Sequence, residues 1–273
     1  MKRIKRRARF IRKYLILTEQ SLQTAMAYRV RFFISLLSGM VQALVLYYIW
    51  QVVYRGQAEL NGFTLAEMVT YIFISYAVRN LYSFYTEIGI SSRIRDGSVA
   101  MELIKPLNYQ LARFFESLGP VVIEGILTGI IVLAVGFGVF KISGPANPVA
   151  GIVFVASLGL SLLVNFAISY VVGLFSFWTT GMFGLINSKR FIVDFFSGGL
   201  VPLAFFPDWL RSVALVLPFH SIVHLPVSIY LGQIEGQQMV QALLIQTFWV
   251  VVLWGLGSLM WSQASKQITI HGG

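Results

Sequence analysis

Two histidines, His220 and His224, stand four residues apart, a spacing at which a helix presents two imidazoles to one zinc ion. In zinc hydrolases with the H-E-x-x-H motif, a glutamate follows the first histidine and acts as the general base. Here that position is Ser221, and no carboxylate neighbours the pair. We therefore expect no metal site and interpret both histidines as polar residues at an interface.

Nucleotide and acyl chemistry are also unsupported. The chain has no G-x-x-x-x-G-K-[ST] loop and no G-x-S-x-G elbow, so it is not expected to bind ATP through a Walker A loop. The triplet at 197–199, Ser-Gly-Gly, is like part of the ABC ATPase signature, but it lies in an apolar stretch. A flexible or close-packed helix position is the better interpretation. The absence of cysteine excludes disulfides, thiolate metal sites and cysteine nucleophiles, so we expect no enzyme and no cofactor in this chain.

The composition is that of a membrane protein. Apolar residues make up 57% and charged residues 12% of the chain, against roughly 45–50% and about 25% in soluble domains, and the mean hydropathy is +0.75. A helix needs roughly 20 apolar residues to cross a bilayer. Six segments qualify, the fifth being short and interrupted by glycine and proline: 32–54, 68–85, 121–140, 149–178, 191–206 and 240–261. We predict a single all-α domain over residues 1–273 with six transmembrane helices.

The positive charge sets the orientation. With a cytosolic N-terminus, 17 Lys and Arg residues fall on the cytosolic side and 3 on the other, as the positive-inside rule requires. Both termini are therefore expected in the cytosol. Eight of the basic residues crowd into positions 2–13, before the first apolar run, which accounts for much of the net charge of +10. That placement favours anionic lipid over nucleic acid as the partner.

Residues 1–28 are expected to form an amphipathic helix in the headgroup plane. Its apolar stripe would consist of Ile4, Ala8, Ile11, Leu15 and Leu22. A disordered basic tail is the alternative, and the lack of a small-residue cleavage site argues against a signal peptide.

Two other segments outside the spans have a distinctive pattern. The loop 88–120 alternates charged and apolar residues and contains Gly97 and Pro106, which favours short helices docked on another protein over a solvated linker. After the fifth span, proline interrupts short apolar runs. Because such backbone is tolerated at membrane depth only inside protein or beside water, we expect short re-entrant or outer helices there, with Trp209 and Tyr230 as headgroup-level anchors.

Arg79 is the charged residue nearest the middle of a span, where a charge costs at least roughly 2.5–3.5 kcal/mol. Tyr76 and Asn80 extend the polar patch. The arginine could belong to a translocation surface or to a structural ion pair, or the span could be displaced toward an interface. For the acids near span ends, Glu124 and Asp194, the expected partners are nearby basic residues: Lys189, Arg190 or Arg113.

The order of these features resembles the permease subunits of ABC-2 type exporters. Two local patterns are similar to a bacterial branch in which permeases are often paired with a second permease. One is I-R-D-G-S-V-A-M-E-L-I-K-P-L at 94–107, and the other is Leu-Pro-Phe at 217–219 followed by Pro226 and I-Y-L-G at 229–232. Leu217 replaces the commoner asparagine, which favours this branch over drug and polysaccharide exporters.

The resemblance implies two facing permeases in a bacterial inner membrane, each docked on a separate ATPase subunit that binds ATP and magnesium. The coupling residues in the loop would be Arg93, Arg95, Asp96, Gly97, Glu102 and Lys105. The substrate pathway would be lined by Gln42, Tyr76, Arg79, Asn80 and Ser83, with Phe195 and Phe196 as apolar gates. The alternative is a secondary carrier or another polytopic membrane protein that works without an ATPase. The inverted repeats and the mid-membrane acid typical of a carrier are not evident.

Overall fold

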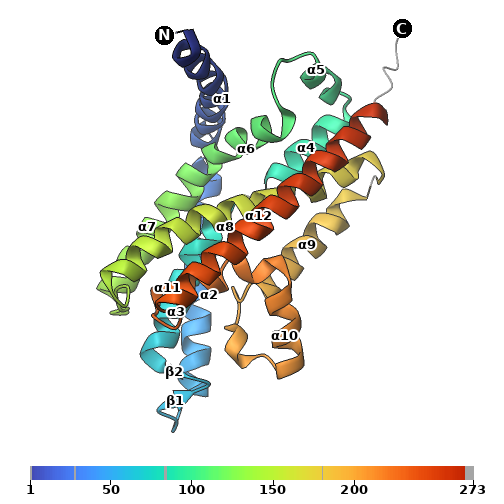
Figure 1. Ribbon diagram of the computed structural model, residues 1–273. Helices are drawn as coiled ribbons and strands as arrows, with labels where there is room; N and C mark the ends of the chain where they lie inside the picture. The colour runs from blue at the N-terminus through green and yellow to red at the C-terminus, as the bar shows by residue number, and fades with distance from the viewer. Residues whose placement is uncertain (1, 28, 83–84, 180, 268–273) are drawn as a thin grey trace.

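The computed structural model describes residues 2–27, 29–82, 85–179 and 181–267, and these residues are predominantly helical (Figure 1). The α-helices are α1 (Lys2–Ala27), α2 (Arg29–Val53), α3 (Leu65–Asn80), α4 (Tyr85–Arg95), α5 (Val99–Leu103), α6 (Tyr109–Pro120), α7 (Leu127–Gly138), α8 (Pro148–Leu174), α9 (Met182–Phe196), α10 (Asp208–Val216), α11 (His224–Tyr230) and α12 (Gln237–Ala264). A π-helical turn η1 (Val121–Ile126) joins α6 to α7, and short 3-10 turns are η2 (Phe175–Phe177), η3 (Leu203–Phe205), η4 (Pro218–Ser221) and η5 (Ser265–Gln267). Two short antiparallel strands, β1 (Glu59–Leu60) and β2 (Phe63–Thr64), form a hairpin between α2 and α3.

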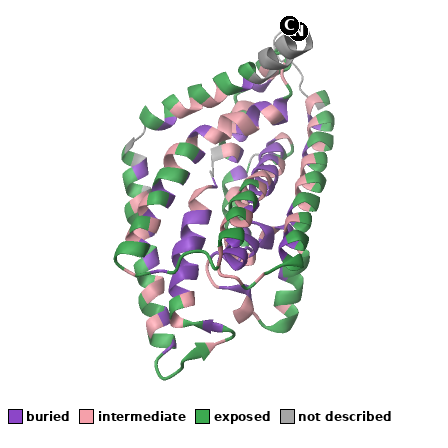
Figure 2. Ribbon diagram, turned by 60° about the vertical axis from the view of Figure 1, so that its left-hand side comes forward, coloured by how far each residue is buried: buried purple, intermediate pink, exposed green. Residues whose placement is uncertain are grey.

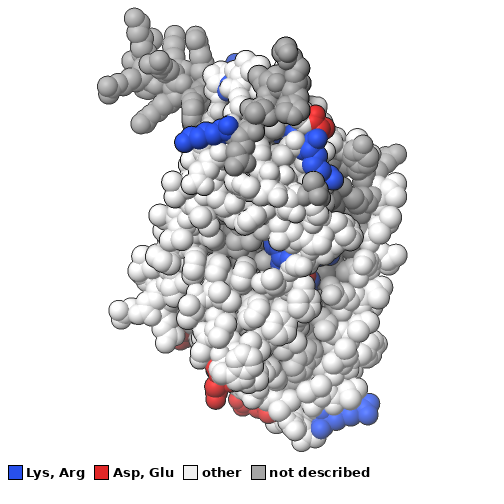
Figure 3. Space-filling view, turned by 90° about the vertical axis from the view of Figure 1, so that its right-hand side faces the viewer, with Lys and Arg blue, Asp and Glu red and all other residues white. Residues whose placement is uncertain are grey.

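Within the described residues, four helical segments are long and apolar enough to cross a membrane: Phe32–Val53, Tyr109–Gly138, Pro148–Phe177 and Gln237–Ala264. The helices at the second and fifth expected spans, α3 and α9, have only 16 and 15 residues. Figure 3 shows a broad uncharged belt between two charged ends of the molecule, with a small charged patch recessed within the belt. The chain is thus a multi-pass helical membrane protein.

Three expected span boundaries are wrong. α3 ends at Asn80 rather than at residue 85. The third long helix begins at Tyr109, in the expected loop, because the chain stays helical through Pro120. Proline lacks the N–H that an α-helix needs at its interior, and the π-helical turn that follows accommodates the change of register.

The fifth expected span is displaced toward the N-terminus. α9 begins at Met182 and ends at Phe196, so the Ser-Gly-Gly triplet at 197–199 follows the helix instead of lying inside it. Gly198 has a φ of +80°, the left-handed conformation that ends helices and that glycine adopts without steric cost. A Cβ at Gly198 would lie 2.8 Å from the Tyr71 hydroxyl, so the triplet is close-packed, as the sequence suggested.

α3 lies at the centre of the bundle. Its residues 68–78 are all buried, and it packs against α2, α7 and α11. Figure 2 shows buried residues concentrated in the inner helices, whereas the outer helices are mostly exposed. On α2 and α12 the exposed side chains are largely apolar, as at Leu37 and Leu259, which suits surfaces that contact lipid or another membrane subunit.

α1 is docked along α6. Tyr14 is 1% exposed and its hydroxyl accepts a hydrogen bond from the Asn108 N–H at 3.0 Å, while the Thr18 hydroxyl donates to the Phe115 carbonyl at 2.7 Å. The docked face is therefore not the expected apolar stripe, of which Leu15 is 52% exposed. The side chains of Ile4, Ala8 and Ile11 lie outside the described residues.

The segment between α9 and α12 is built from short helices, as expected. Trp209 is 69% exposed, but Tyr230 is 6% exposed and its hydroxyl donates to the Ser143 carbonyl at 3.1 Å. The expectation that Tyr230 anchors the protein at the headgroups is therefore wrong, because this residue fixes α11 inside the protein.

Candidate functional site

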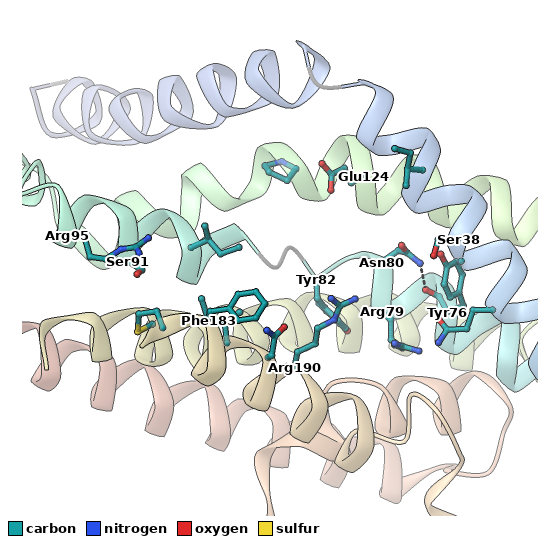
Figure 4. A pocket seen from close by; sticks show the side chains of 18 residues that line it. Ser38, Tyr76, Arg79, Asn80, Tyr82, Ser91, Arg95, Glu124, Phe183 and Arg190 are labelled. Carbon is teal, nitrogen blue, oxygen red and sulfur yellow. Dashed lines mark hydrogen bonds between the residues drawn. The ribbon is translucent and has the colours of Figure 1, made fainter. Parts of the chain in front are cut away.

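A cavity of about 680 Å³ opens among α2, α3, α4, the end of α6, η1 and α9 (Figure 4). Its lining combines apolar side chains with three arginines and one glutamate: Ile34, Ser38, Gly39, Gln42, Tyr76, Arg79, Asn80, Tyr82, Ile88, Ser91, Arg95, Pro120, Glu124, Met182, Phe183, Ile186, Asn187 and Arg190. A cavity of this size can enclose a small organic molecule or part of a larger one.

Four of the expected pathway residues line this cavity: Gln42, Tyr76, Arg79 and Asn80. The fifth, Ser83, lies outside the described residues. The Asn80 side chain donates to the Tyr76 carbonyl at 2.8 Å, which fixes its position at the end of α3. The polar patch identified around Arg79 therefore faces a hollow inside the protein.

Two glycines let the cavity walls approach α3 closely. A Cβ at Gly39 would lie 1.1 Å from the Tyr76 hydroxyl oxygen, and one at Gly125 would lie 2.8 Å from the Asn80 carbonyl oxygen. Since real Cβ atoms do not approach so closely, a larger residue at Gly39 would displace the Tyr76 ring, and one at Gly125 would separate η1 from α3. The shape of the cavity depends on both.

Arg79 is paired with Asp194 of α9 at 3.2 Å, and both side chains are about one-sixth exposed. Its guanidinium also lies 3.4 Å from the Gly199 carbonyl, beyond the end of α9. An arginine at this depth needs a compensating acid. The observed partner of Asp194 is Arg79, which was not among the expected partners Lys189, Arg190 and Arg113. Arg79 thus belongs both to a structural ion pair and to the cavity wall.

A second ion pair is fully buried. Lys189 of α9 donates to Glu87 of α4 at 3.0 Å and to the Ser169 hydroxyl of α8 at 2.8 Å, and the two charged side chains are 5% and 0% exposed. Lys189 therefore lies inside α9, although the fifth span was expected to begin only at residue 191. The pair connects α4 directly to α9.

The loop after α4 is held by a network of charges. Arg113 of α6, which is 4% exposed, lies 3.2 Å from Glu102 of α5 and 2.6 Å from Glu116. Arg93 of α4 is bonded to Glu116, and Lys105 lies 2.9 Å from Glu102. Three of the expected coupling residues, Arg93, Glu102 and Lys105, therefore fix α5 against α4 and α6.

Two other expected coupling residues shape the turn between α4 and α5. Gly97 has a φ of +74°, and Asp96 accepts a hydrogen bond from the Ser98 N–H at 2.9 Å. Hydrogen bonds from the Ser98 hydroxyl and N–H, in that order, lower the pKa of Asp96 below its ordinary value, because they stabilise the carboxylate. Arg95, by contrast, is directed to the cavity (Figure 4).

The charged network supports an exposed apolar surface on α5. Met101, Leu103 and Ile104 are 63%, 48% and 76% exposed. α5 lies at the end of the molecule that also carries α1 and the C-terminal end of α12, opposite the hairpin and α10 (Figure 1). Exposed apolar side chains on a rigid polar support are typical of a protein docking site.

Phe195 and Phe196 are not part of the cavity lining. The ring of Phe195 lies 5.0 Å from that of Phe206, and the ring of Phe196 lies 6.3 Å from that of Phe219. These rings cluster where α9 ends, so they lie between the cavity wall and the short helices. Their role as a gate stays a prediction.

Arg190, Ser91 and Phe183 line the cavity without having been predicted there. On α9, Asn187, Arg190 and Asp194 recur at intervals of three and four residues, which places them on one helical face. This polar stripe was readable in principle, but the expected span began only at residue 191. No comparable pattern in the sequence around Ser91 predicts that this residue lines the cavity.

The two histidines are separately bonded. His220 is 2% exposed and its Nδ1 lies 2.6 Å from the Leu217 carbonyl, while His224 Nδ1 lies 3.3 Å from the Ser228 hydroxyl. His220 is thus a buried residue and not an interfacial one. Among the residues that the structure describes, no group of three or more metal-ligating side chains occurs.

Long apolar helices around a polar cavity are the architecture of a multi-pass membrane protein. A family model described as ABC-2 family transporter protein matches residues 40–272. The chain belongs to this family, and the resemblance to ABC-2 type permeases is thereby confirmed. A search of curated proteins found no match.

Proposed function

We propose that this chain is the permease subunit of an ATP-driven exporter, in which it forms the substrate pathway with a second permease. Separate ATPase subunits would bind ATP and magnesium and supply the energy. Membership of the ABC-2 family supports this assignment, and so does a cavity lined by residues of six helical elements.

The observation that carries the proposal is the exposed apolar surface of α5. Apolar side chains on a flexible loop need no fixed position. Met101 and Ile104, by contrast, are exposed on a segment that the surrounding ion pairs hold in place, as a docking surface requires. We infer that this surface seats in a cleft of the ATPase. Burial of such side chains contributes roughly 25 cal/mol per Å² of apolar area.

A connected path leads from this surface to the cavity. α4 begins inside the bundle and ends at the loop, and its Glu87 is bonded to Lys189 of α9. α9 in turn is bonded to α3 through Asp194 and Arg79. A movement of α5 driven by the ATPase would therefore displace two cavity walls, and the rings of Phe195 and Phe196 at the end of α9 would follow as a gate.

We propose six transmembrane segments with both termini in the cytosol of a bacterial inner membrane. α3 and α9 would be the second and fifth. At 1.5 Å per residue, the 16 residues of α3 extend about 24 Å, and the turns that flank it would complete the crossing. α1 would lie at the headgroups, with Leu15 toward lipid.

The test is the substitution Ile104→Asp. A charge on the docking surface is expected to abolish co-purification of an ATPase subunit and ATP-dependent export, without loss of membrane insertion. The matched control is Val216→Asp, since Val216 on α10 is 74% exposed, against 76% for Ile104, and lies at the opposite end of the molecule (Figure 1). Export that survives Ile104→Asp unchanged, or equal losses in both variants, would contradict the proposal.

A further inference from the structure

The cavity has the chemistry of a site for an amphiphilic anion. Arg79, Arg95 and Arg190 contribute three positive charges to its lining, and Glu124 contributes one negative charge. Figure 4 shows Arg95 and Ser91 together on α4, and Arg190 on α9. Because Arg79 is already paired with Asp194, the charge that a ligand would meet comes mainly from Arg95.

Ser91 provides an independent indication of a ligand. It is 1% exposed, it lines the cavity, and its hydroxyl has no hydrogen-bond partner among the described residues. A buried hydroxyl without a partner costs about 1–3 kcal/mol, so native structures rarely leave one unsatisfied. Arg95, one helical turn away, forms no hydrogen bond or ion pair with another described residue.

The remaining wall is apolar. Ile88 lies one turn before Ser91 on α4, and Met182, Phe183 and Ile186 face the cavity from α9. The Phe183 side chain is 84% exposed. Contact of so much apolar surface with water is unfavourable, so lipid, another subunit or a ligand is expected to cover it. A charged end and an apolar wall in one cavity match a molecule that has both parts.

We propose that the cavity binds an amphiphile bearing a phosphate or carboxylate group. Its anionic group would accept hydrogen bonds from Arg95 and Ser91, with Arg190 adding positive potential, and its apolar part would lie along Ile88 and Phe183. Arginine suits this role because its guanidinium binds such anions through two parallel hydrogen bonds. As a statement about exported cargo, this inference rests on the proposed function; as a statement about binding, it concerns this chain alone.

The experiment uses the purified full chain in phosphatidylcholine nanodiscs without any ATPase. The probe is a hexadecyl phosphate carrying a diazirine, and the matched probes carry trimethylammonium or a hydroxyl on the same chain. Irradiation followed by peptide mass spectrometry is expected to place the phosphate probe on peptides containing Ile88 or Phe183. Labelling by the cationic probe is expected to be at least about tenfold weaker.

The variants test which residues recognise the anion. Arg95→Gln is expected to reduce labelling about tenfold, and Ser91→Ala a few-fold, in line with charged and neutral hydrogen bonds. Arg211→Gln is the control, because Arg211 is exposed on α10 and away from the cavity. Equal labelling by the cationic probe, or labelling unchanged in Arg95→Gln and Ser91→Ala, overturns the inference.

Competition identifies the source of the anion. Displacement of the probe by phosphatidylglycerol added to the nanodisc supports a ligand that enters from the bilayer, whereas displacement by inorganic phosphate supports one that enters from water. If neither competitor reduces labelling, the anion site is refuted. All of these readouts are independent of the ATPase, so failure here leaves the proposed coupling untouched, and failure of Ile104→Asp leaves the anion site untouched.

Discussion

Removal of the Lys189 charge gives the sharpest prediction about how this fold is held together. In Lys189→Met, the carboxylate of Glu87 stays behind with no exposure to solvent. Breaking a buried pair by removing one partner costs about 3–5 kcal/mol, a large part of the roughly 5–15 kcal/mol that separates folded from unfolded protein. We expect α4 and α9 to separate and the protein to unfold at much lower denaturant concentrations.

The double variant Glu87→Gln/Lys189→Met distinguishes the ion pair from simple packing. Because it removes both charges, most of the lost stability is expected to return, with a coupling free energy of about 2–3 kcal/mol. The surface pair of Lys105 and Glu102 provides the control. Lys105 is 51% exposed, so Lys105→Met is expected to cost less than about 1 kcal/mol.

The chain contains no cysteine, which makes the assay direct. A single cysteine placed at Ala167, a fully buried position on α8, reacts with a thiol dye only when the bundle opens. Titration with denaturing detergent in each background then gives the free energy of unfolding. The reasoning is refuted if Lys189→Met is no more costly than Lys105→Met, or if the double variant loses the sum of both single losses.

Three further predictions follow from the packing and the turn chemistry. Gln246→Leu is expected to cost about 1–3 kcal/mol by the same unfolding assay, because the fully buried amide bonds to two serines of α8 and to the Ser221 carbonyl; unchanged stability would contradict this. Gly198→Ala is expected to lower the melting temperature by several degrees, since φ is +80° and the Tyr71 hydroxyl is 2.8 Å from the new Cβ, whereas Gly159→Ala, which meets open space, is expected to leave it unchanged or raise it. Asp96 is expected to titrate below 3.8 by carbon-13 NMR; because the folded-state pKa is lowered, its contribution to the loop is present above pH 3.8 and lost as the pH falls through that lowered value, and titration at or above 3.8 would count against the Ser98 hydrogen bonds.

The membrane helices were largely predictable because their signal is local. A run of apolar residues long enough to cross a bilayer has few alternatives, and a charge such as Arg79 inside one must face a polar partner or a cavity. Four of the five expected pathway residues line one cavity. The fifth, Ser83, lies outside the described residues, and the role of all five in a pathway stays a prediction. The local sequence pattern alone was therefore enough to predict the polar patch of Tyr76, Arg79 and Asn80 on α3.

The start of α9 was not predictable in the same way. The fifth span was expected to begin at residue 191, directly after Lys189 and Arg190, whereas α9 begins at Met182. The acid that compensates Lys189 lies 102 residues earlier in the chain, and a pairing over that distance leaves no trace in one sequence. Similarly, the third span was expected to begin at residue 121, but a π-helical turn continues the preceding helix past Pro120.

The central claim is that this permease is driven through α5 by an ATPase subunit. The most direct measurement places a photoreactive amino acid at Met101, an exposed position of α5, in a complex that exports in the presence of ATP. The account predicts an adduct between this position and a subunit that contains a Walker A sequence. Two results would contradict it. One is ATP-dependent export without any adduct between position 101 and a Walker A subunit. The other is labelling of position 101 by an impermeant reagent added outside the cell.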